Sequence, residues 1–179
     1  YVASWYFLDN DTSLPFSSLG NHGELVSPML PLGDYSLTTN LGAELTKQNM
    51  AGNWLLLTTT SSCQQACQDT LLMIRQARKS TGINRKVIKP LILLQTENAL
   101  EPFDVDLSEA FPQLAVIPSD TNKTQPLLDI LVKAHPDAEN NIYMVDPYNN
   151  LMMVYPADTT PKGLMDDLKR LLKVNKPKL

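Results

Sequence analysis

Both cysteines of the chain lie in residues 61–67, SSCQQAC, where Cys63 and Cys67 are four positions apart. They follow the apolar run NWLLLTTT, which predicts a buried strand. Two sulfurs at this spacing can form an intramolecular disulfide, and two thiolates can hold a soft ion such as Cu(I). Zinc fits less well, because it needs four ligands and the chain has two Cys and two His. Two idle cysteines or a static disulfide is the alternative without chemistry.

The residues around the cysteines predict the start of a helix. Ser62 is expected to be the N-cap and Gln65 its partner at N3, in a capping box of the form S-x-x-Q. Apolar residues then continue at helical spacing to Gly82, which suits the C-terminal end. Cys63 would then be at N1, where the helix dipole favours a thiolate, and Cys67 would lie one turn later on the same face.

The remaining pattern predicts an α/β protein with one domain. The order of elements is β, β, α, β, β, α, β, β, α, which is the thioredoxin-like order, with a central mixed sheet flanked by helices. Strands are expected at 35–40, 53–60, 87–96 and 113–118 and in a hairpin over 141–156, and helices at 62–82, 124–134 and 160–174. In this architecture the cysteines occupy the place of the redox site. On the last helix, Asp166 and Asp167 are expected to be solubilising charges on the polar face.

The segment before this domain divides into two parts. Residues 9–34 are rich in Pro and Gly and are predicted to be a loop-like extended arm leading into a domain over 35–175. Residues 1–8, YVASWYFL, are too short to span a bilayer, which needs about 20 residues. Their aromatic content suggests the end of a longer membrane anchor, with an edge strand or a plain arm as the alternative. The net charge of −4 gives no support for nucleic acid as a partner.

Two stretches resemble the Sco/SenC proteins. The first is YSLTTNLGAELTKQNMAGNWLLLTTTSSCQQAC, in which Gly52, Asn53 and Trp54 stand where the family has GKW before its C-x-x-x-C motif. The second is NIYMVDPYNNLMMVYP, which is similar to the Sco hairpin. The resemblance covers about residues 30–174 and is closest to a divergent group of bacterial membrane-anchored Sco-like proteins. It implies a thioredoxin-like fold, an N-terminal membrane anchor, Cu(I) binding, and delivery of copper or electrons to cytochrome c oxidase.

The chain departs from the family at the third copper ligand. Sco proteins use two cysteines and a histidine just before the hairpin, and that position falls on Ala138 here. The nearest histidine is His135, which is kept with Cys63 and Cys67 as a candidate metal ligand. His22, in the arm, is a weaker candidate. No proline precedes Ile142, where thioredoxins keep a cis-proline beside their disulfide.

The resemblance implies three ranked functions. The first is an accessory factor for respiratory oxidase assembly, acting through Cys63 and Cys67 by thiol-disulfide exchange, by Cu(I) handling, or by both. Its partners would be a terminal oxidase subunit or its assembly factors, and its domain would be anchored to the membrane on the periplasmic side. The second is a general extracytoplasmic thiol-disulfide oxidoreductase, and the third is a non-catalytic partner-binding module. On the first reading the chain is an assembly factor or metallochaperone-like protein; if it is an enzyme, it is a thiol-disulfide oxidoreductase.

Overall fold

The computed structural model describes residues 22–103 and 106–174. A six-stranded mixed sheet forms its centre, in the order β1-β8-β7-β4-β5-β6. The prediction for residues 1–8, and that for residues 9–21 of the arm, lie outside the described residues. The predicted thioredoxin-like α/β fold is confirmed. The strands are β1 Glu24–Pro31, β4 Trp54–Thr60, β5 Ile88–Leu94, β6 Ala115–Ile117, β7 Ile142–Val145 and β8 Asn150–Tyr155.

Strand β4 is the centre of the sheet, because it pairs parallel with β5 and antiparallel with β7. All seven of its residues are buried. Leu55 and Leu57 belong to the core on one face of the sheet, whereas Trp54 and Leu56 belong to the core on the other. This burial on both faces explains why the sequence shows a continuous apolar run instead of an alternating one.

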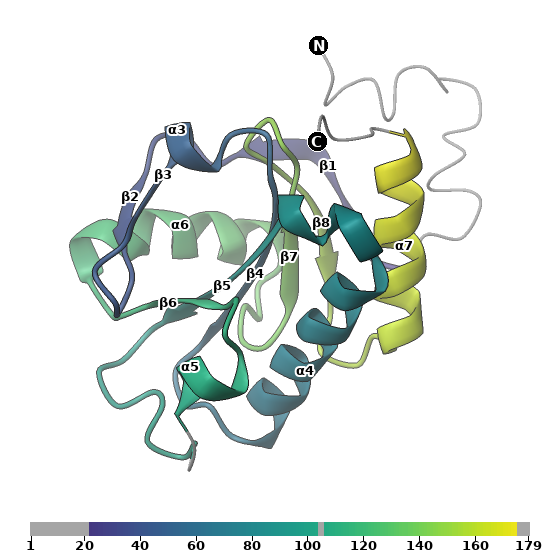
Figure 1. The fold of residues 1–179 in the computed structure, drawn as a ribbon. Helices are drawn as coiled ribbons and strands as arrows, with labels where there is room; N and C mark the ends of the chain where they lie inside the picture. Colours follow the sequence, from purple (N-terminus) through teal and green to yellow (C-terminus); the bar gives the residue numbers. More distant parts are fainter. Residues whose placement is uncertain (1–21, 104–105, 175–179) are drawn as a thin grey trace.

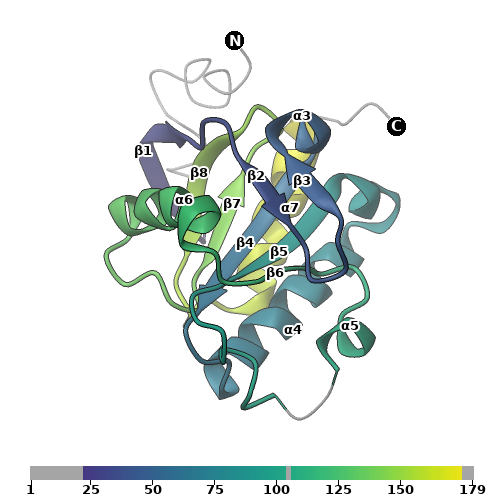
Figure 2. The same cartoon turned by 90° about the vertical axis from the view of Figure 1, so that its left-hand side faces the viewer.

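Helices cover both faces of the sheet (Figure 1). On one face α4 (Gln65–Ser80) packs beside α7 (Pro161–Val174), and the short 3-10 helix η1 (Gly82–Val87) follows α4. The other face carries α6 (Thr121–Ala134), the hairpin of β2 (Ser36–Thr38) and β3 (Glu44–Thr46), and the short helix α3 (Lys47–Met50). Figure 2, a quarter turn away, shows α6 and the β2–β3 hairpin in front of the sheet. The last short helix, α5 (Leu107–Ala110), lies near the start of α4.

Strand β1 corrects the prediction of a loop-like arm over residues 9–34. It pairs antiparallel with β8 at the edge of the sheet, and the register shifts between Leu25 and Leu30. Pro28 and Pro31 lie within it. An edge strand pairs on one side only, so it tolerates proline, which has no N–H to donate. The prolines that signalled a loop are therefore compatible with this strand.

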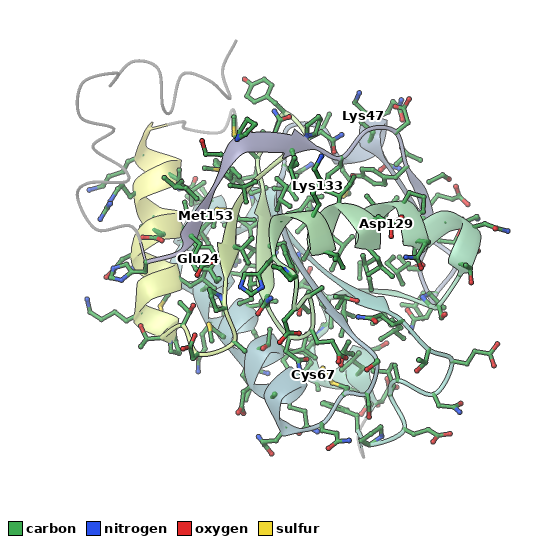
Figure 3. All side chains as sticks on the ribbon, turned by 180° about the vertical axis from the view of Figure 1, so that it is seen from behind. Glu24, Lys47, Cys67, Asp129, Lys133 and Met153 are labelled. Atoms are coloured by element: carbon green, nitrogen blue, oxygen red, sulfur yellow. A yellow bond between two sulfur atoms is a disulfide. The ribbon has the colours of Figure 1, made fainter. Side chains whose placement is uncertain are left out.

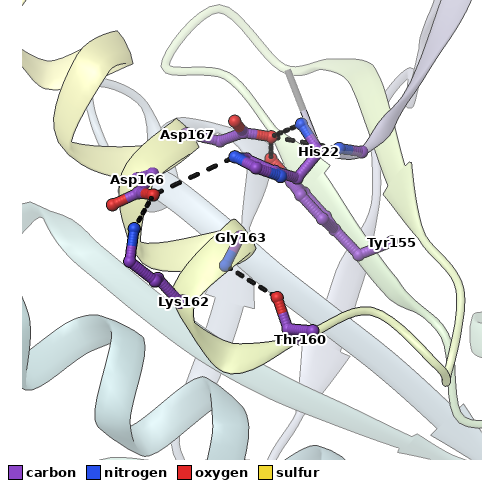
Figure 4. A network of polar contacts seen from close by, with 8 residues as sticks. His22, Tyr155, Thr160, Lys162, Gly163, Asp166 and Asp167 are labelled. Carbon is purple, nitrogen blue, oxygen red and sulfur yellow. Dashed lines mark hydrogen bonds and ion pairs between the residues drawn. The ribbon is translucent and has the colours of Figure 1, made fainter. Parts of the chain in front are cut away.

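A buried carboxylate fastens the start of β1 to α7 (Figure 4). The Oδ2 atom of Asp167 accepts hydrogen bonds from the backbone N–H of His22 (2.8 Å), the backbone N–H of Gly23 (3.0 Å) and the hydroxyl of Tyr155 (3.0 Å). Asp167 is fully buried, so the prediction that it is a solubilising charge is wrong. It lies three residues after the buried Leu164 and therefore falls on the apolar stripe of the helix.

Helix α7 begins as the sequence predicts. The Oγ1 atom of Thr160 accepts a hydrogen bond from the backbone N–H of Gly163 at 3.1 Å. Replacing Thr160 with alanine is expected to lower the free energy of unfolding by about 1 kcal/mol, because a first-turn N–H loses its acceptor. Chemical denaturation measures the change. The neighbouring Thr159→Ala variant is the control, and equal losses in the two variants would contradict the N-cap assignment.

Candidate functional site

Cys63 and Cys67 form a disulfide at the carboxyl end of β4. Their sulfur atoms are 2.01 Å apart and their Cα atoms 5.0 Å apart. The predicted intramolecular disulfide is confirmed, and its place after the central strand is the one expected from the order of elements. The structure therefore brings together the two residues that the sequence singled out for thiol chemistry.

The helix after the disulfide starts later than predicted. Helix α4 begins at Gln65, and its N-cap is Gln64, whose side chain makes no capping hydrogen bond. The predicted capping box at Ser62 is wrong, because the residue that precedes the helix is Gln64, whereas the backbone N–H of Cys63 donates to the carbonyl oxygen of Ala99 at 2.7 Å. Cys63 consequently lies outside the helix, and Cys67 is the third residue of its first turn. The expectation of a thiolate at Cys63 rested on a position in the helix that this residue does not occupy.

The disulfide is buried within a cluster of apolar side chains. Cys63 has 0% and Cys67 2% of its surface exposed. The cluster around them combines residues of α4, β5 and β6 with a cover formed by α5 and its flanks, namely Leu71, Ile92, Leu94, Ala99, Leu107, Phe111 and Val116. A partner thiol can reach a sulfur atom only if part of this cover moves. Sequence reasoning missed the cover, although Asp106 as an N-cap followed by apolar residues at helical spacing was a signal for α5.

The loop before β7 fastens the other side of the site. The backbone N–H of Asn140 donates to the carbonyl oxygen of Thr59 at 3.0 Å, and the carbonyl oxygen of Asn140 accepts from the hydroxyl of Thr70 at 2.9 Å. Asn140 has a φ of 62°, a left-handed conformation that asparagine adopts more readily than most residues. The carboxylate of Glu139 accepts from the backbone N–H and the hydroxyl of Ser61. These polar contacts hold the loop before β7 against β4 and α4.

His135 is the C-cap of α6, and its ring lies close to polar atoms of Glu24, Asp137 and Asn141. Its Nε2 atom is 3.7 Å from Oε2 of Glu24, and its Nδ1 atom is 3.0 Å from the carbonyl oxygen of Asp137. Figure 3 shows that Glu24, on the edge strand, is well separated from Cys67. Ala138 is buried in the core beside α6. Its methyl group offers no metal ligand.

No three-ligand metal group is assembled in the described part of the chain. A search among residues 22–103 and 106–174 finds no cluster of three His, Cys, Asp or Glu side chains that could hold a metal ion. His22 lies beside α7, with its Nε2 atom 3.9 Å from Oδ2 of Asp166. After reduction, the residues present therefore fit a two-thiolate site for a soft ion. They do not fit a site of two cysteines and one histidine, and a metal-ligand role for His135 stays a prediction.

The fold and the buried cysteine pair define a thioredoxin-like domain with a C-x-x-x-C disulfide. The chain belongs to the family described as "Transmembrane-like, thioredoxin-like, C-terminal domain", which it matches over residues 54–175. No curated protein sequence matches the chain. No helix among the described residues is long and apolar enough to cross a membrane.

Solved structures of Sco proteins share this fold. Apo Sco1 from Thermus thermophilus has a TM-score of 0.68 at 15% identity, covering 86% of this chain and 98% of that one. Yeast Sco1 with copper bound has a TM-score of 0.63 at 16% identity, covering 84% and 92%. BsSco, described as having a disulfide switch and as a member of the Sco family of cytochrome c oxidase assembly proteins, has a TM-score of 0.60 at 10% identity, covering 83% and 96%. At these identities the likeness establishes a Sco-like thioredoxin fold.

Proposed function

We propose that this chain is a Sco-like accessory factor for respiratory cytochrome c oxidase assembly, and that it acts by thiol-disulfide exchange at Cys63 and Cys67. The observation that carries the proposal is the disulfide itself, which joins the chain's only two cysteines at the redox position of a thioredoxin-like fold. The description of BsSco as an assembly protein with a disulfide switch supports the same chemistry and the same setting.

The exchange begins when the cover over the disulfide opens. A partner thiolate attacks one sulfur atom, the bond between Cys63 and Cys67 breaks, and the other sulfur leaves as a thiolate that takes up a proton. The second thiol of the partner then resolves the mixed disulfide. Two electrons pass from the partner dithiol to this chain, whose cysteines end as two thiols. Cys67 lies in the first turn of α4, where the backbone N–H groups stabilise a leaving thiolate.

In this proposal Cu(I) is an ion that the protein carries and passes on to a partner. Two thiolates can hold one Cu(I) ion without a third ligand, whereas Cu(II) prefers nitrogen and oxygen donors, which this site lacks. The copper-bound yeast Sco1 supports a copper-handling role on this fold. Cargo held by two sulfur atoms alone is expected to exchange readily with a partner that offers more ligands.

The proposed setting follows from the same relatives. The partners would be a terminal oxidase subunit or another of its assembly factors, and the domain would be anchored to the membrane with its cysteines on the periplasmic side. A related SCO1/SenC family protein from Bacillus anthracis is described as a lipoprotein, which supports attachment to a membrane. An oxidising compartment also suits a disulfide.

Thiol exchange is tested by measuring how the disulfide equilibrates with a dithiol buffer. Wild-type protein is incubated with mixtures of reduced and oxidised dithiothreitol, quenched with an alkylating reagent, and analysed by mass spectrometry. We expect one transition between a form with no modified cysteine and a form with two. A disulfide that stays intact in fully reduced buffer under native conditions would instead favour a static cross-link and the partner-binding alternative.

Copper binding is tested with the reduced protein. We expect one Cu(I) per chain and at least tenfold weaker Cu(I) binding in Cys63→Ala, because a single thiolate cannot hold the ion. Cu(II) is expected to bind poorly, and His135→Ala and His22→Ala are expected to behave as wild type. Tight Cu(II) binding that His135→Ala abolishes would show that His135 is a displaced third ligand. Failure of reduced wild type to bind Cu(I) would remove the copper role and leave general thiol exchange.

A further inference from the structure

A pocket of about 630 Å³ lies beside the disulfide cover, between α4, η1 and the segment that follows α5. Its floor is apolar and includes the buried side chains of Ile74, Pro90 and Phe111. A volume of this size is in the range of pockets that hold small organic ligands. An apolar floor of this kind suits a ligand with a flat or compact hydrocarbon body.

The rim of the pocket carries positive charge without a carboxylate. Arg75, Arg78, Lys79 and Arg85 line it, and no Asp or Glu does. Among the described residues none of these four side chains makes an ion pair. The chain as a whole has a net charge of −4, so this concentration of cations is opposite in sign to the protein that carries it. Burial and the nearby charge of Arg85 both lower the pKa of Arg78.

Two of the guanidinium groups are held in place by the backbone. The Nε atom of Arg78 donates to the carbonyl oxygen of Ile88 at 2.9 Å. Arg75 donates to the carbonyl oxygen of Ala110 at 3.1 Å and stacks over the ring of Phe111, with its Cζ atom 5.2 Å from the centroid. Each group uses one of the five N–H donors that arginine offers. A fixed guanidinium with spare donors is suited to bidentate recognition of phosphate or carboxylate.

We propose that this pocket binds an amphipathic anion, meaning a molecule with an apolar body and a phosphate or carboxylate group. The bound anion keeps the cover over the disulfide in place. Leu71 and Phe111 connect the two sites, because each lines the pocket and also packs against the cysteines. The pocket keeps its shape only while the α5 segment, defined here as residues 106–114, is in place. A ligand that binds the covered form alone must make opening of the cover less frequent.

The size of this effect follows from mass action. If reduction requires the α5 segment to open, a ligand at ten times its dissociation constant is expected to slow reduction about tenfold. The binding part of the proposal does not depend on the proposed function, whereas the locking part rests on it, because it concerns access to the redox-active disulfide. Binding and reduction are therefore measured separately.

Binding is measured by calorimetry with 1-naphthyl phosphate as the probe. Inorganic phosphate and 1-naphthol, which each carry half of its chemistry, are expected to bind at least tenfold more weakly. The double variant Lys79→Gln/Arg85→Gln, whose two side chains are exposed, is expected to lose about tenfold in affinity. The control Lys86→Gln/Lys133→Gln removes two exposed charges that do not line the pocket and is expected to bind as wild type. Equal affinity in the two double variants, or no binding by wild type, would overturn the site.

The natural source of the anion is distinguished with phosphatidylcholine vesicles that contain one fifth phosphatidylglycerol. Vesicle binding that only Lys79→Gln/Arg85→Gln abolishes supports the site and identifies a lipid head group. If naphthyl phosphate binds but the vesicles do not, the site is supported and its natural ligand is a soluble anion.

Reduction of the disulfide by dithiothreitol, in which the reagent gives up two electrons and becomes a cyclic disulfide, is followed with and without the probe. Binding without any slowing of reduction would overturn the lock while leaving the pocket. A disulfide that resists reduction in the free protein would instead contradict the proposed redox function.

Discussion

Replacing Asp167 with alanine is expected to destabilise the protein by about 4 kcal/mol, since the change leaves two buried donors and one partly buried donor without their acceptor. These donors are the backbone N–H groups of His22 and Gly23 and the hydroxyl of Tyr155. Chemical denaturation measures the loss in the free energy of unfolding. Because two of the donors immediately precede β1, the amides of residues 22–25 are also expected to exchange their hydrogens faster than the rest of the sheet.

The adjacent residue provides a matched control. Asp166 has the same side chain on the same helix, but it is partly exposed and is paired with Lys162 at 3.0 Å. Asp166→Ala is therefore expected to change stability little and to leave the exchange of residues 22–25 unaltered. If both alanine variants destabilise the protein equally, the stabilising role assigned to the buried carboxylate is wrong.

Phe111→Ala is expected to have the second large effect, on both stability and redox behaviour. Phe111 is 7% exposed and packs on the disulfide from the α5 segment. Its truncation is expected to destabilise the protein by about 3 kcal/mol and to speed the reduction of the disulfide by dithiothreitol at least tenfold. The reason for the faster reduction is that the cavity left behind opens a path to Cys63 and Cys67.

A general loss of stability must be separated from this local effect. Leu168 is fully buried in the core between α7 and the sheet, which is distinct from the cluster around the cysteines. Leu168→Ala is expected to destabilise the protein by a similar amount, about 3 kcal/mol, without a comparable increase in the reduction rate. Equal acceleration in the two variants would mean that reduction requires global unfolding and that the α5 segment is not a local cover.

The sequence predicts the centre of the fold well because the central strands are buried on both faces. NWLLLTTT and VIKPLILLQT are short continuous apolar runs, which predict strands buried on both faces. Each of them contains a strand of the sheet. Strand β1 could not be found in the same way. Its prolines indicate a loop, and only pairing with β8, far along the chain, makes it a strand. Asp167 was misread for a similar reason, since its partners lie just before β1 and on β8.

The cysteine pair of the candidate site follows from spacing in the sequence. The placement of His135 and of the cover depends on contacts between residues far apart in the chain. The cysteines are neighbours in the chain, so their disulfide was predictable from local geometry. His135 lies 68 positions after Cys67 in the chain, and the structure pairs it with Glu24. The cover over the sulfur atoms depends on where the α5 segment folds back. That placement is set by packing against β5 and β6, which no local pattern encodes.

Strand β1 also fixes the order in which the molecule can be completed. Its partner β8 is made late in synthesis, and Asp167, which holds the two residues just before β1, lies 145 positions after His22. At about 5–20 residues per second, β1 would wait on the order of 10 s after leaving the ribosome before its partner emerged. A waiting strand with open hydrogen-bonding edges is a site for aggregation, and prolines at two of its positions reduce that risk. The prolines that make this strand look like a loop in the sequence are thus expected to reduce aggregation of the nascent chain until β8 is available for pairing.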